Sequence, residues 1–264
     1  MNTVIFSKRY SRKMRVRLTL LVLLLACLTA GAQQQIPNMN FDQWSQKGRS
    51  WNPWAPDTKA PAWDTANHGL SLLGINGCSP EYEHVAVPGT GKAAAKIETK
   101  KVLGILVAGT IFTGKFIKVV RMSGAQMSMG YPFHGRPRSL SGYIHYIPGS
   151  IDTASDNYKH LKGATDIGRI EISLEDWDGP LLLDSTTEEF KHTEEVPHPH
   201  RIGHGVLDVS QDTGGYIPFE IPIEYVNGKM PSYIVIVASA SRYAQHFTGS
   251  TGSIMYIDEF KLNY

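Results

Sequence analysis

Residues 232–264 read SYIVIVASASRYAQHFTGSTGSIMYIDEFKLNY, and this stretch decides the fold class. Its first part, residues 233–240, is continuously apolar or small, which predicts a strand covered on both faces. A polar loop follows, and an alternating pattern of apolar and polar residues then runs from Ile254 to Leu262. The stretch therefore predicts two buried β-strands separated by a loop that carries polar and aromatic side chains.

The alternation in the last strand predicts which side chains share a face, because successive side chains of a strand point to opposite sides. One face would carry Ile254, Tyr256, Asp258, Phe260 and Leu262, and the other Met255, Ile257, Glu259 and Lys261. Asp258 is the exception in its row, because burying a carboxylate without a partner is costly. The pattern therefore predicts a cation or a hydrogen-bonding neighbour beside Asp258.

Short strand patterns recur earlier in the chain, at 93–99, 139–147, 169–177 and 216–225, with turn residues between them. Two prolines in 216–225 indicate an edge strand or a bulge, since proline cannot donate to a sheet ladder. Many short alternating strands predict an all-β fold, an antiparallel sandwich or barrel. Residues 33–92 are poor in strand patterns and are predicted to form long loops around it.

The first 32 residues predict a secretory signal peptide. Six basic residues precede the apolar run LTLLVLLLACLTA, and Ala30-Gly31-Ala32 follows as a cleavage site of small residues. The run is short for a transmembrane helix, so no membrane span is predicted. Residues 33–264 would then form a single domain. In an alternative interpretation the residues before Cys27 resemble a bacterial lipobox, which would make Cys27 a lipid-anchored first residue; both interpretations predict export.

Charge and cysteine content narrow the class of partners. Removing the six basic residues of the predicted signal peptide changes the formal net charge of the chain from +2 to −4. A mildly acidic domain gives no reason to expect nucleic acid as a partner. Cys78 would be the only cysteine left, so no disulfide within the chain is predicted.

Several blocks of the chain resemble one known family in the order in which they occur. They are NMNFDQW (38–44), WNPW (51–54), AWDTAN (62–67), AAAKIET (93–99), AGTIFTGKF (108–116), YPFHGRPRSLSGYIHYIPG (131–149) and the segment from Val237 to Leu262. Together they are similar to the putative carbohydrate metabolism domain of secreted and surface proteins from glycan-degrading Gram-negative bacteria. The resemblance implies an antiparallel jelly-roll β-sandwich of the galactose-binding-domain-like type. It also implies a location in the periplasm or on the outer cell surface.

The resemblance also implies a structural calcium ion, because jelly-roll modules of this kind often hold one between an N-terminal segment and the last strand. The matching carboxylates here are Asp42 and Asp258. Calcium takes six to eight oxygen ligands, and backbone carbonyls would complete the shell. In the alternative, Asp258 accepts backbone N–H groups at a bulge while Asp42 caps a turn.

A sugar site needs a flat aromatic face beside planar polar groups for the hydroxyls. Three regions of the chain offer this combination. The candidate carbohydrate-binding residues are Trp54, Trp63 and Asp64 in the first region, His134 and Arg136 in the second, and Arg242, Tyr243 and Phe247 in the third. For the tryptophans, packing beneath long loops is the alternative.

The sequence gives weaker evidence for catalytic residues than for sugar-binding residues. Glu171 and Glu175 share the outward face of one predicted strand, and Asp176 and Asp178 follow near a turn; all four are predicted to be solvated surface groups. The histidines of residues 198–204 lie among Pro and Gly, which indicates an exposed loop and not a metal site. No nucleophile motif with informative spacing is present.

These patterns favour a secreted, single-domain module that binds an oligo- or polysaccharide in glycan capture or polysaccharide metabolism. A glycoside hydrolase on a jelly-roll scaffold is the first alternative, and it would need two carboxylates facing each other across an aromatic-lined groove. A surface adhesion or protein-interaction module is the second. The fold class alone does not decide among them.

Overall fold

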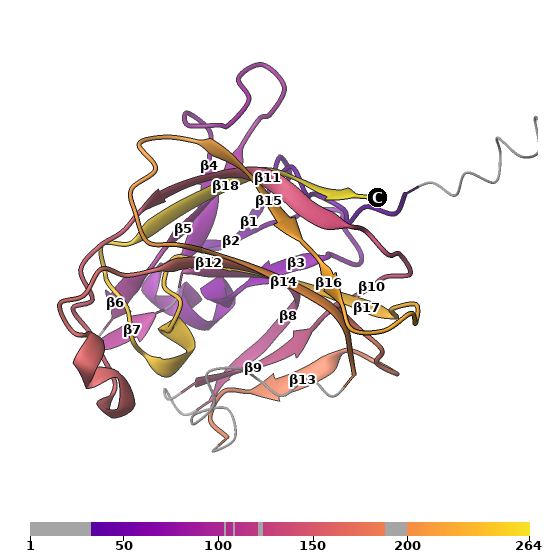
Figure 1. The fold of residues 1–264 in the computed structure, drawn as a ribbon. Helices are drawn as coiled ribbons and strands as arrows, with labels where there is room; N and C mark the ends of the chain where they lie inside the picture. The colour runs from indigo at the N-terminus through magenta and orange to yellow at the C-terminus, as the bar shows by residue number, and fades with distance from the viewer. Residues whose placement is uncertain (1–32, 103, 108, 121–123, 188–199) are drawn as a thin grey trace, which may run out of the picture. The chain divides into compact units, whose positions relative to one another are not determined.

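The computed structural model describes residues 33–102, 104–107, 109–120, 124–187 and 200–264. The predicted signal peptide, Cys27 and His198 lie outside these residues. The described chain forms two large antiparallel β-sheets and two short hairpins (Figure 1). None of the described helices is long and apolar enough to cross a membrane.

The larger sheet has nine strands, seven of them in one continuous path. In spatial order the path is β13 (Leu181–Asp184), β9 (Gly124–Met129), β8 (Thr110–Val120), β17 (Tyr233–Ser239), β12 (Gly168–Glu175), β14 (Arg201–Val209) and β16 (Glu224–Tyr225). Two short strands pair off this path, β10 (Tyr131–Pro132) with β17 and β3 (Trp63–Thr65) with β8.

The smaller sheet has five strands. Their spatial order is β15 (Ile217–Pro222), β11 (Ser139–Ile147), β18 (Ile254–Asn263), β5 (Ala94–Glu98) and β4 (Cys78–Glu81). The chain passes back and forth between the two sheets, from β11 to β12, from β14 to β15 and from β17 to β18, as in a jelly-roll sandwich (Figure 1). The all-β jelly roll expected from the sequence is confirmed, and β15, with its two prolines, is an edge strand as predicted.

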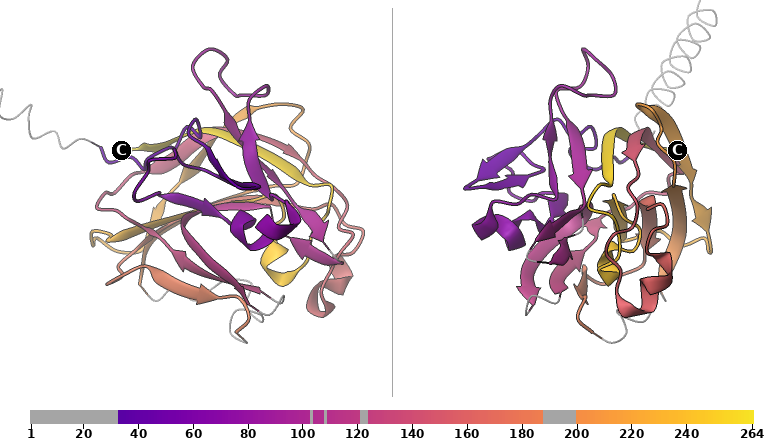
Figure 2. Two further views of the ribbon diagram at one scale, coloured as in Figure 1. Left: turned by 180° about the vertical axis from the view of Figure 1, so that it is seen from behind. Right: turned by 90° about the vertical axis from the view of Figure 1, so that its left-hand side faces the viewer.

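The remaining elements are short. They are the hairpin of β1 (Ser45–Lys47) and β2 (Ser50–Asn52), the hairpin of β6 (Lys100–Val102) and β7 (Ile105–Val107), and the 3₁₀ helices η1 (Ala66–Leu73), η2 (Asp156–Leu161) and η3 (Ala244–His246). The β1–β2 hairpin lies against η1 and β4, and Figure 2 shows these elements together in indigo and purple.

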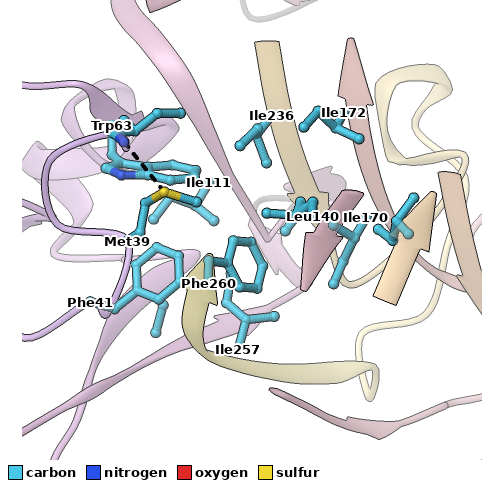
Figure 3. Packing of buried hydrophobic residues seen from close by; sticks show 14 of the residues in the cluster. Met39, Phe41, Trp63, Ile111, Leu140, Ile170, Ile172, Ile236, Ile257 and Phe260 are labelled. Atoms are coloured by element: carbon cyan, nitrogen blue, oxygen red, sulfur yellow. Dashed lines mark hydrogen bonds between the residues drawn. The ribbon is translucent and has the colours of Figure 1, made fainter. Parts of the chain in front are cut away.

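The main core lies between the two sheets. Every second residue of β12 and β17 points into it, and these residues are fully buried: Ile170, Ile172, Leu174, Ile234, Ile236 and Ala238. Phe41, Trp63 and Phe260 extend the core toward the N-terminal loops through edge-to-face ring contacts, with centroids 5.1 to 6.3 Å apart (Figure 3). Such rings contribute a large share of the buried apolar area.

The opposite face of β17 is covered as well. Val235 and Val237 pack against a second apolar cluster formed by Phe112, Phe116 and Met129. The predicted strand is therefore fully covered on its core face and partly covered on the other. The covering side chains come from β8 and β9, which continue the large sheet beyond β17.

The last strand differs from its predicted alternation. Met255 and Ile257 are fully buried in the core, although both were assigned to the face opposite Phe260 and Leu262. A β-bulge explains the difference: Ser141 pairs with Lys261 but Tyr143 pairs with Asp258, so β18 has one extra residue. Glu259 within the bulge has φ +51°, and the faces exchange at that point.

Candidate functional site

The outer face of β12 and β14 carries a row of charged side chains that we call the polar face. Its members are Arg169, Glu171, Ser173 and Glu175 of β12 and Arg201, His204 and Asp208 of β14. The alternate residues of β12 fill the core, so these side chains point to the other side of the sheet. The register places Arg169 across from Asp208, Ser173 across from His204 and Glu175 across from Arg201, while Glu171 lies across from Val206.

The charged groups of the polar face are held in pairs. Arg169 donates from Nε and Nη2 to the two carboxylate oxygens of Asp208, at 2.7 and 2.8 Å. His204 Nε2 lies 3.0 Å from Glu171 Oε1. These four side chains are 19 to 33% exposed. Paired groups at this level of exposure are fixed in orientation and still reachable by a ligand.

Glu175 occupies a different environment from Glu171. Its side chain is fully buried, accepts a hydrogen bond from Ser173 Oγ and lies 3.7 Å from Arg201 Nε. The predicted solvated position of Glu175 is therefore wrong, because the partly buried Arg201 and the buried Ser173 accompany the carboxylate below the surface.

The two glutamates have opposite pKa shifts. Burial raises the pKa of Glu175, and the Ser173 hydroxyl and the Arg201 charge offset this only in part. Burial also acts on Glu171, but the hydrogen bond and charge of His204, with Arg169 and Arg201 nearby, hold its pKa below the usual value. At neutral pH Glu171 is therefore a carboxylate acceptor.

Two partly exposed aromatic rings stand at the end of the polar face nearest Glu175. Tyr233 pairs with Glu175 across the sheet, and its ring centroid lies 6.0 Å from that of Trp177. Ser232 fixes Trp177 by accepting its backbone N–H at 2.8 Å and donating to its carbonyl at 2.6 Å. A side chain at Gly130 would come within about 3 Å of both rings, so glycine leaves them room.

Arg242 stands at the other end of the polar face. Its Nη1 donates to Asp208 Oδ2 at 3.1 Å, and its guanidinium carbon lies 5.0 Å from the centroid of the Tyr243 ring. Asp208 therefore accepts from both Arg169 and Arg242. The structure brings the predicted residues Arg242 and Tyr243 to this face.

A buried aspartate fixes the loop that carries Arg242. Asp166 Oδ2 accepts from Ser241 Oγ at 2.6 Å, from Ser250 N at 2.8 Å and from Ser253 Oγ at 2.9 Å. Burial raises the pKa of Asp166 above its usual value, and the hydrogen bonds offset part of that rise. Phe247 lies in the same loop, half-buried, with a left-handed backbone at φ +53°.

Trp63 and Asp64 are part of the core and have no surface for a sugar. Trp63 is fully buried, and its indole N–H donates to Pro37 O at 2.9 Å. Asp64 accepts from the backbone N–H groups of Thr65 at 2.7 Å and Phe116 at 2.9 Å, and burial raises its pKa to about 6. Packing beneath the loops, the alternative for the tryptophans, describes Trp63.

The second candidate pair lies apart from Arg242. Arg136 donates to the carbonyls of Lys229 and Asn227, and its guanidinium carbon lies 4.0 Å from the Tyr225 ring centroid. His134 is exposed, with Nδ1 3.1 Å from Pro231 O. Arg136 therefore holds the loop between β16 and β17, and its donors are engaged there.

Trp54 is separate from both groups. It is half-buried and lines a pocket of about 360 Å³ beside the β1–β2 hairpin. The eight candidate sugar residues therefore do not form one site. Arg242 and Tyr243 lie at the polar face with Phe247 in the same loop, Trp63 and Asp64 lie in the core, His134 and Arg136 contact the β16–β17 loop, and Trp54 lines its own pocket.

The structure brings the predicted metal ligands Asp42 and Asp258 together. Asp42 Oδ1, Asp258 Oδ2 and Glu259 Oε1 each lie within 4 Å of the point where a Cβ of Gly91 would stand. Burial raises the pKa of Asp258 to about 6, and the charges of Glu259 and Asp42 add to that rise.

All four carboxylate oxygens of the two aspartates accept hydrogen bonds. Asp258 accepts from Ala86 N at 2.9 Å and from Glu259 N at 2.8 Å, and Asp42 accepts from Lys92 N, Ala93 N and Asn40 Nδ2. These contacts are those of the alternative interpretation, in which Asp258 accepts backbone N–H groups at a bulge. Among the described residues no group of three or more His, Cys, Asp or Glu is arranged to hold a metal ion.

Sequence reasoning missed the partners on β14. The sequence predicts an exposed loop for His204, but His204 lies in strand β14, opposite Ser173. The pairing of Arg169 with Asp208 was not foreseen either. His204, Val206 and Asp208 are spaced two residues apart, so in a strand they would share one face, and this spacing was the signal in the sequence.

Comparison with known proteins places the chain in a family. Residues 40–263 match the model of the putative carbohydrate metabolism domain. The chain belongs to this family. No curated protein matches the chain.

Two solved structures share the fold of this family member. A "putative glycoside hydrolase" from Bacteroides thetaiotaomicron has a TM-score of 0.64 at 20% identity, over 88% of this chain and 72% of that one. A second, from Bacteroides vulgatus, has a TM-score of 0.63 at 21% identity, over 85% and 96%. A cellulose-specific carbohydrate-binding module has a TM-score of 0.37 at 9% identity, over 88% and 95%. The family match makes the domain carbohydrate-related, and its own sheets make it a β-sandwich.

Proposed function

We propose that this domain is an exported carbohydrate-binding module that holds an oligo- or polysaccharide along the polar face. The observation that carries the proposal is Arg242, whose guanidinium is fixed between Asp208 and the ring of Tyr243. A planar fork beside an aromatic face is the combination that recognises a sugar ring and its hydroxyls.

The other groups of the polar face fit the same ligand. Sugar hydroxyls both donate and accept, and Glu171 and His204 offer an acceptor and an imidazole side by side. Trp177 and Tyr233 offer a second aromatic surface at the opposite end. A row with aromatic groups at both ends and charged pairs between them suits an extended glycan better than a single sugar.

The first experiment is a glycan array on residues 33–264, repeated with Glu171→Gln and Arg242→Lys. We expect glycan binding without release of reducing ends, weakened in both variants. Arg136→Lys is the matched control, because Arg136 also stacks on a tyrosine but serves a different loop. An array without hits, or equal binding by all variants, would contradict the proposal and favour a protein partner.

A glycoside hydrolase is the second candidate function. One observation favours it: Glu171 and Glu175 have pKa shifts in opposite directions, which is how enzymes separate a base from an acid. The geometry weighs against it. Four residues along a strand span about 13 Å, beyond the roughly 5–9.5 Å that hydrolases use, and Glu175 is fully buried. Release of reducing ends that disappears in Glu175→Gln would establish the enzyme.

Calcium is part of the proposal as a structural ion held by Asp42 and Asp258, with Glu259 beside them. Its support is that Asp42 Oδ1, Asp258 Oδ2 and Glu259 Oε1 each lie within 4 Å of one point, and backbone carbonyls would have to supply the rest of the shell. The ion would neutralise their repulsion and tie the N-terminal segment to the last strand.

Export, and either periplasmic or outer-surface location, rest on the signal pattern in residues 1–32. Mass spectrometry of the N-terminus of the protein from its host is the direct test. A first residue after Ala32 would support the signal peptide, a lipid-modified Cys27 would support the anchor, and an intact Met1 would exclude both.

A further inference from the structure

One member of the polar face, Arg201, also lines a small polar pocket that we call the Arg201 pocket. Its volume is about 60 Å³. Pockets that hold a whole small molecule have volumes of about 300–1,000 Å³, so this one has room for a functional group and not for a sugar ring. The residues that line it are Asp176, His200, Arg201, Ile202, Asn227 and Lys229.

Arg201 is less engaged than the other two arginines at this face. Arg169 donates two hydrogen bonds to Asp208, and Arg242 donates one. Among the described residues Arg201 has one ion pair, with Glu175, and the distance of 3.7 Å from Nε to Oε1 is too long for a hydrogen bond. Its side chain is 20% exposed, but Nε lies below the surface. A ligand would therefore meet the terminal nitrogens of the guanidinium.

The charges at the pocket favour an anion. Arg201 and Lys229 are cations, and Asp176 is the carboxylate in the described lining, 2.8 Å from Lys229 Nζ. Burial raises the pKa of Glu175, which favours its neutral form and leaves the charge of Arg201 less well compensated. A planar guanidinium matches a carboxylate, because two parallel N–H groups can donate to its two oxygens.

The strand register brings this pocket close to the aromatic pair of the polar face. Tyr233 pairs with Glu175 and Glu175 pairs with Arg201, so the three form one row across β17, β12 and β14. Neighbouring strands are about 4.8 Å apart, which places the Cα of Arg201 about 10 Å from that of Tyr233. Trp177 directly follows Asp176 of the lining. A sugar ring on Trp177 and Tyr233 can therefore direct a substituent toward the pocket.

Hydrogen bonds fix the walls of the pocket without a ligand. Arg136 donates to the carbonyls of Asn227 and Lys229, and Lys229 N donates to Asn227 Oδ1 at 3.0 Å. On the other side Asp176 N donates to His200 O at 2.9 Å. A preformed site loses less conformational freedom when it binds.

We propose that the glycan on the polar face contains a uronic acid, whose carboxylate enters the Arg201 pocket while its ring lies on Trp177 and Tyr233. This inference rests on the proposed function and narrows its ligand to acidic oligo- and polysaccharides. Arg201 would donate a forked pair of hydrogen bonds, and Lys229 would add attraction from the rim. Because the pocket opens at the surface, salt would screen that attraction.

The test compares each acidic glycan with its own methyl ester, which removes the charge and keeps the sugar. Oligosaccharides of galacturonic acid and of glucuronic acid, and their esters, are titrated into the protein by calorimetry. We expect at least one acid to bind about tenfold more tightly than its ester at low salt. The preference should shrink between about 0.05 and 0.5 M sodium chloride. The same acid should shift the indole N–H signal of Trp177 by NMR.

Two substitutions test the pocket itself. Arg201→Lys keeps the charge but loses the planar fork, so the preference for the acid should fall about tenfold. Lys229→Gln removes the charge of a side chain that is 67% exposed, so it should reduce the preference without changing the unfolding temperature. Lys261→Gln removes an exposed charge from the small sheet and is the matched control. If Arg201→Lys fails to fold, Lys229→Gln still tests the pocket.

The outcomes separate this inference from the proposed function. Equal binding of acid and ester, or a preference that the pocket variants keep, overturns the inference. If neutral glycans bind on the array while no uronic acid binds, the inference is overturned and the polar face remains a glycan site. If no glycan of either kind binds, the proposed function fails as well.

Discussion

Asp42 and Asp258 lie near opposite ends of the described chain and hold the two ends of one loop. Asp258 accepts the N–H of Ala86, and Asp42 accepts the N–H groups of Lys92 and Ala93. The loop before β5 is thus fastened by two carboxylates that also repel each other and Glu259. Any change in their charge therefore alters both the loop and the end of β18.

This cluster predicts a dependence of stability on pH. The pKa of Asp258 is raised to about 6 and that of Glu259 is raised too, so the folded state binds their protons more tightly than the unfolded state. Their contribution to the free energy of unfolding is therefore largest near pH 4 and falls as the pH rises through about 6. Asp64, with a pKa also near 6, acts in the same direction.

Glu259→Gln tests the origin of that dependence. In chelator at pH 8 we expect the variant to be more stable than the parent by a few tenths to about 1 kcal/mol, since one repelling charge is removed. The difference should vanish toward pH 4. Urea unfolding at several pH values measures it, with the exposed Glu83→Gln of the same loop as control. A constant difference across pH would show that the charge of Glu259 is not its origin.

Calcium is expected to reverse the pH trend. An ion among Asp42, Asp258 and Glu259 binds the ionised carboxylates, so its stabilisation should grow as the pH rises from 5 to 8. At about one hundred times the dissociation constant the gain is about 2.7 kcal/mol. Thermal unfolding in calcium, in magnesium and in chelator measures it, with Asp42→Asn as the variant that weakens the site. An unfolding temperature that ignores calcium at every pH would leave the carboxylates as acceptors of backbone N–H groups alone.

The bulge in β18 leaves no room for a side chain at Gly142 of β11. A Cβ there would lie 2.6 Å from Phe260 Cδ1 and 3.0 Å from Asp258 O. We expect Gly142→Ala to destabilise the fold by about 1–3 kcal/mol through overpacking. Gly228→Ala, with nothing within 4 Å of the new methyl group, should change stability far less. If both substitutions changed the free energy of unfolding in urea equally, the bulge would have shifted to accommodate the new methyl group.

The fold was largely predictable from strand period and turn residues, but the bulge was not. The strand patterns found β5, β11 and β12 with nearly their observed bounds. The predicted strand at 216–225 is divided between β15 and β16, which lie in different sheets. The bulge escaped because Asp258-Glu259 carries no distinctive signal, and one extra residue exchanges the faces of everything before it.

The candidate site was only half predictable. Arg242 and Tyr243 were found because they follow a strongly apolar strand. Strand β14 was missed because two of its inward positions, Gly203 and Gly205, carry no side chain, and a Cβ of Gly205 would lie 2.5 Å from Pro222 O. Only Leu207 and Val209 keep the hydrophobic alternation, which is too short a pattern to identify the strand and place His204 and Asp208 beside Glu171 and Arg169.

Two arginines that lie over tyrosine rings are expected to separate binding from stability. Arg242→Lys loses the planar fork between Asp208 and Tyr243, so we expect glycan affinity to fall about tenfold with little change in the unfolding temperature. Arg136→Lys loses two bonds to the β16–β17 loop, so stability should fall while affinity is kept. Isothermal titration with the best array hit and thermal unfolding measure both. If Arg136→Lys weakened binding and Arg242→Lys did not, the glycan would lie across the β16–β17 loop, and the polar face would lose its assignment.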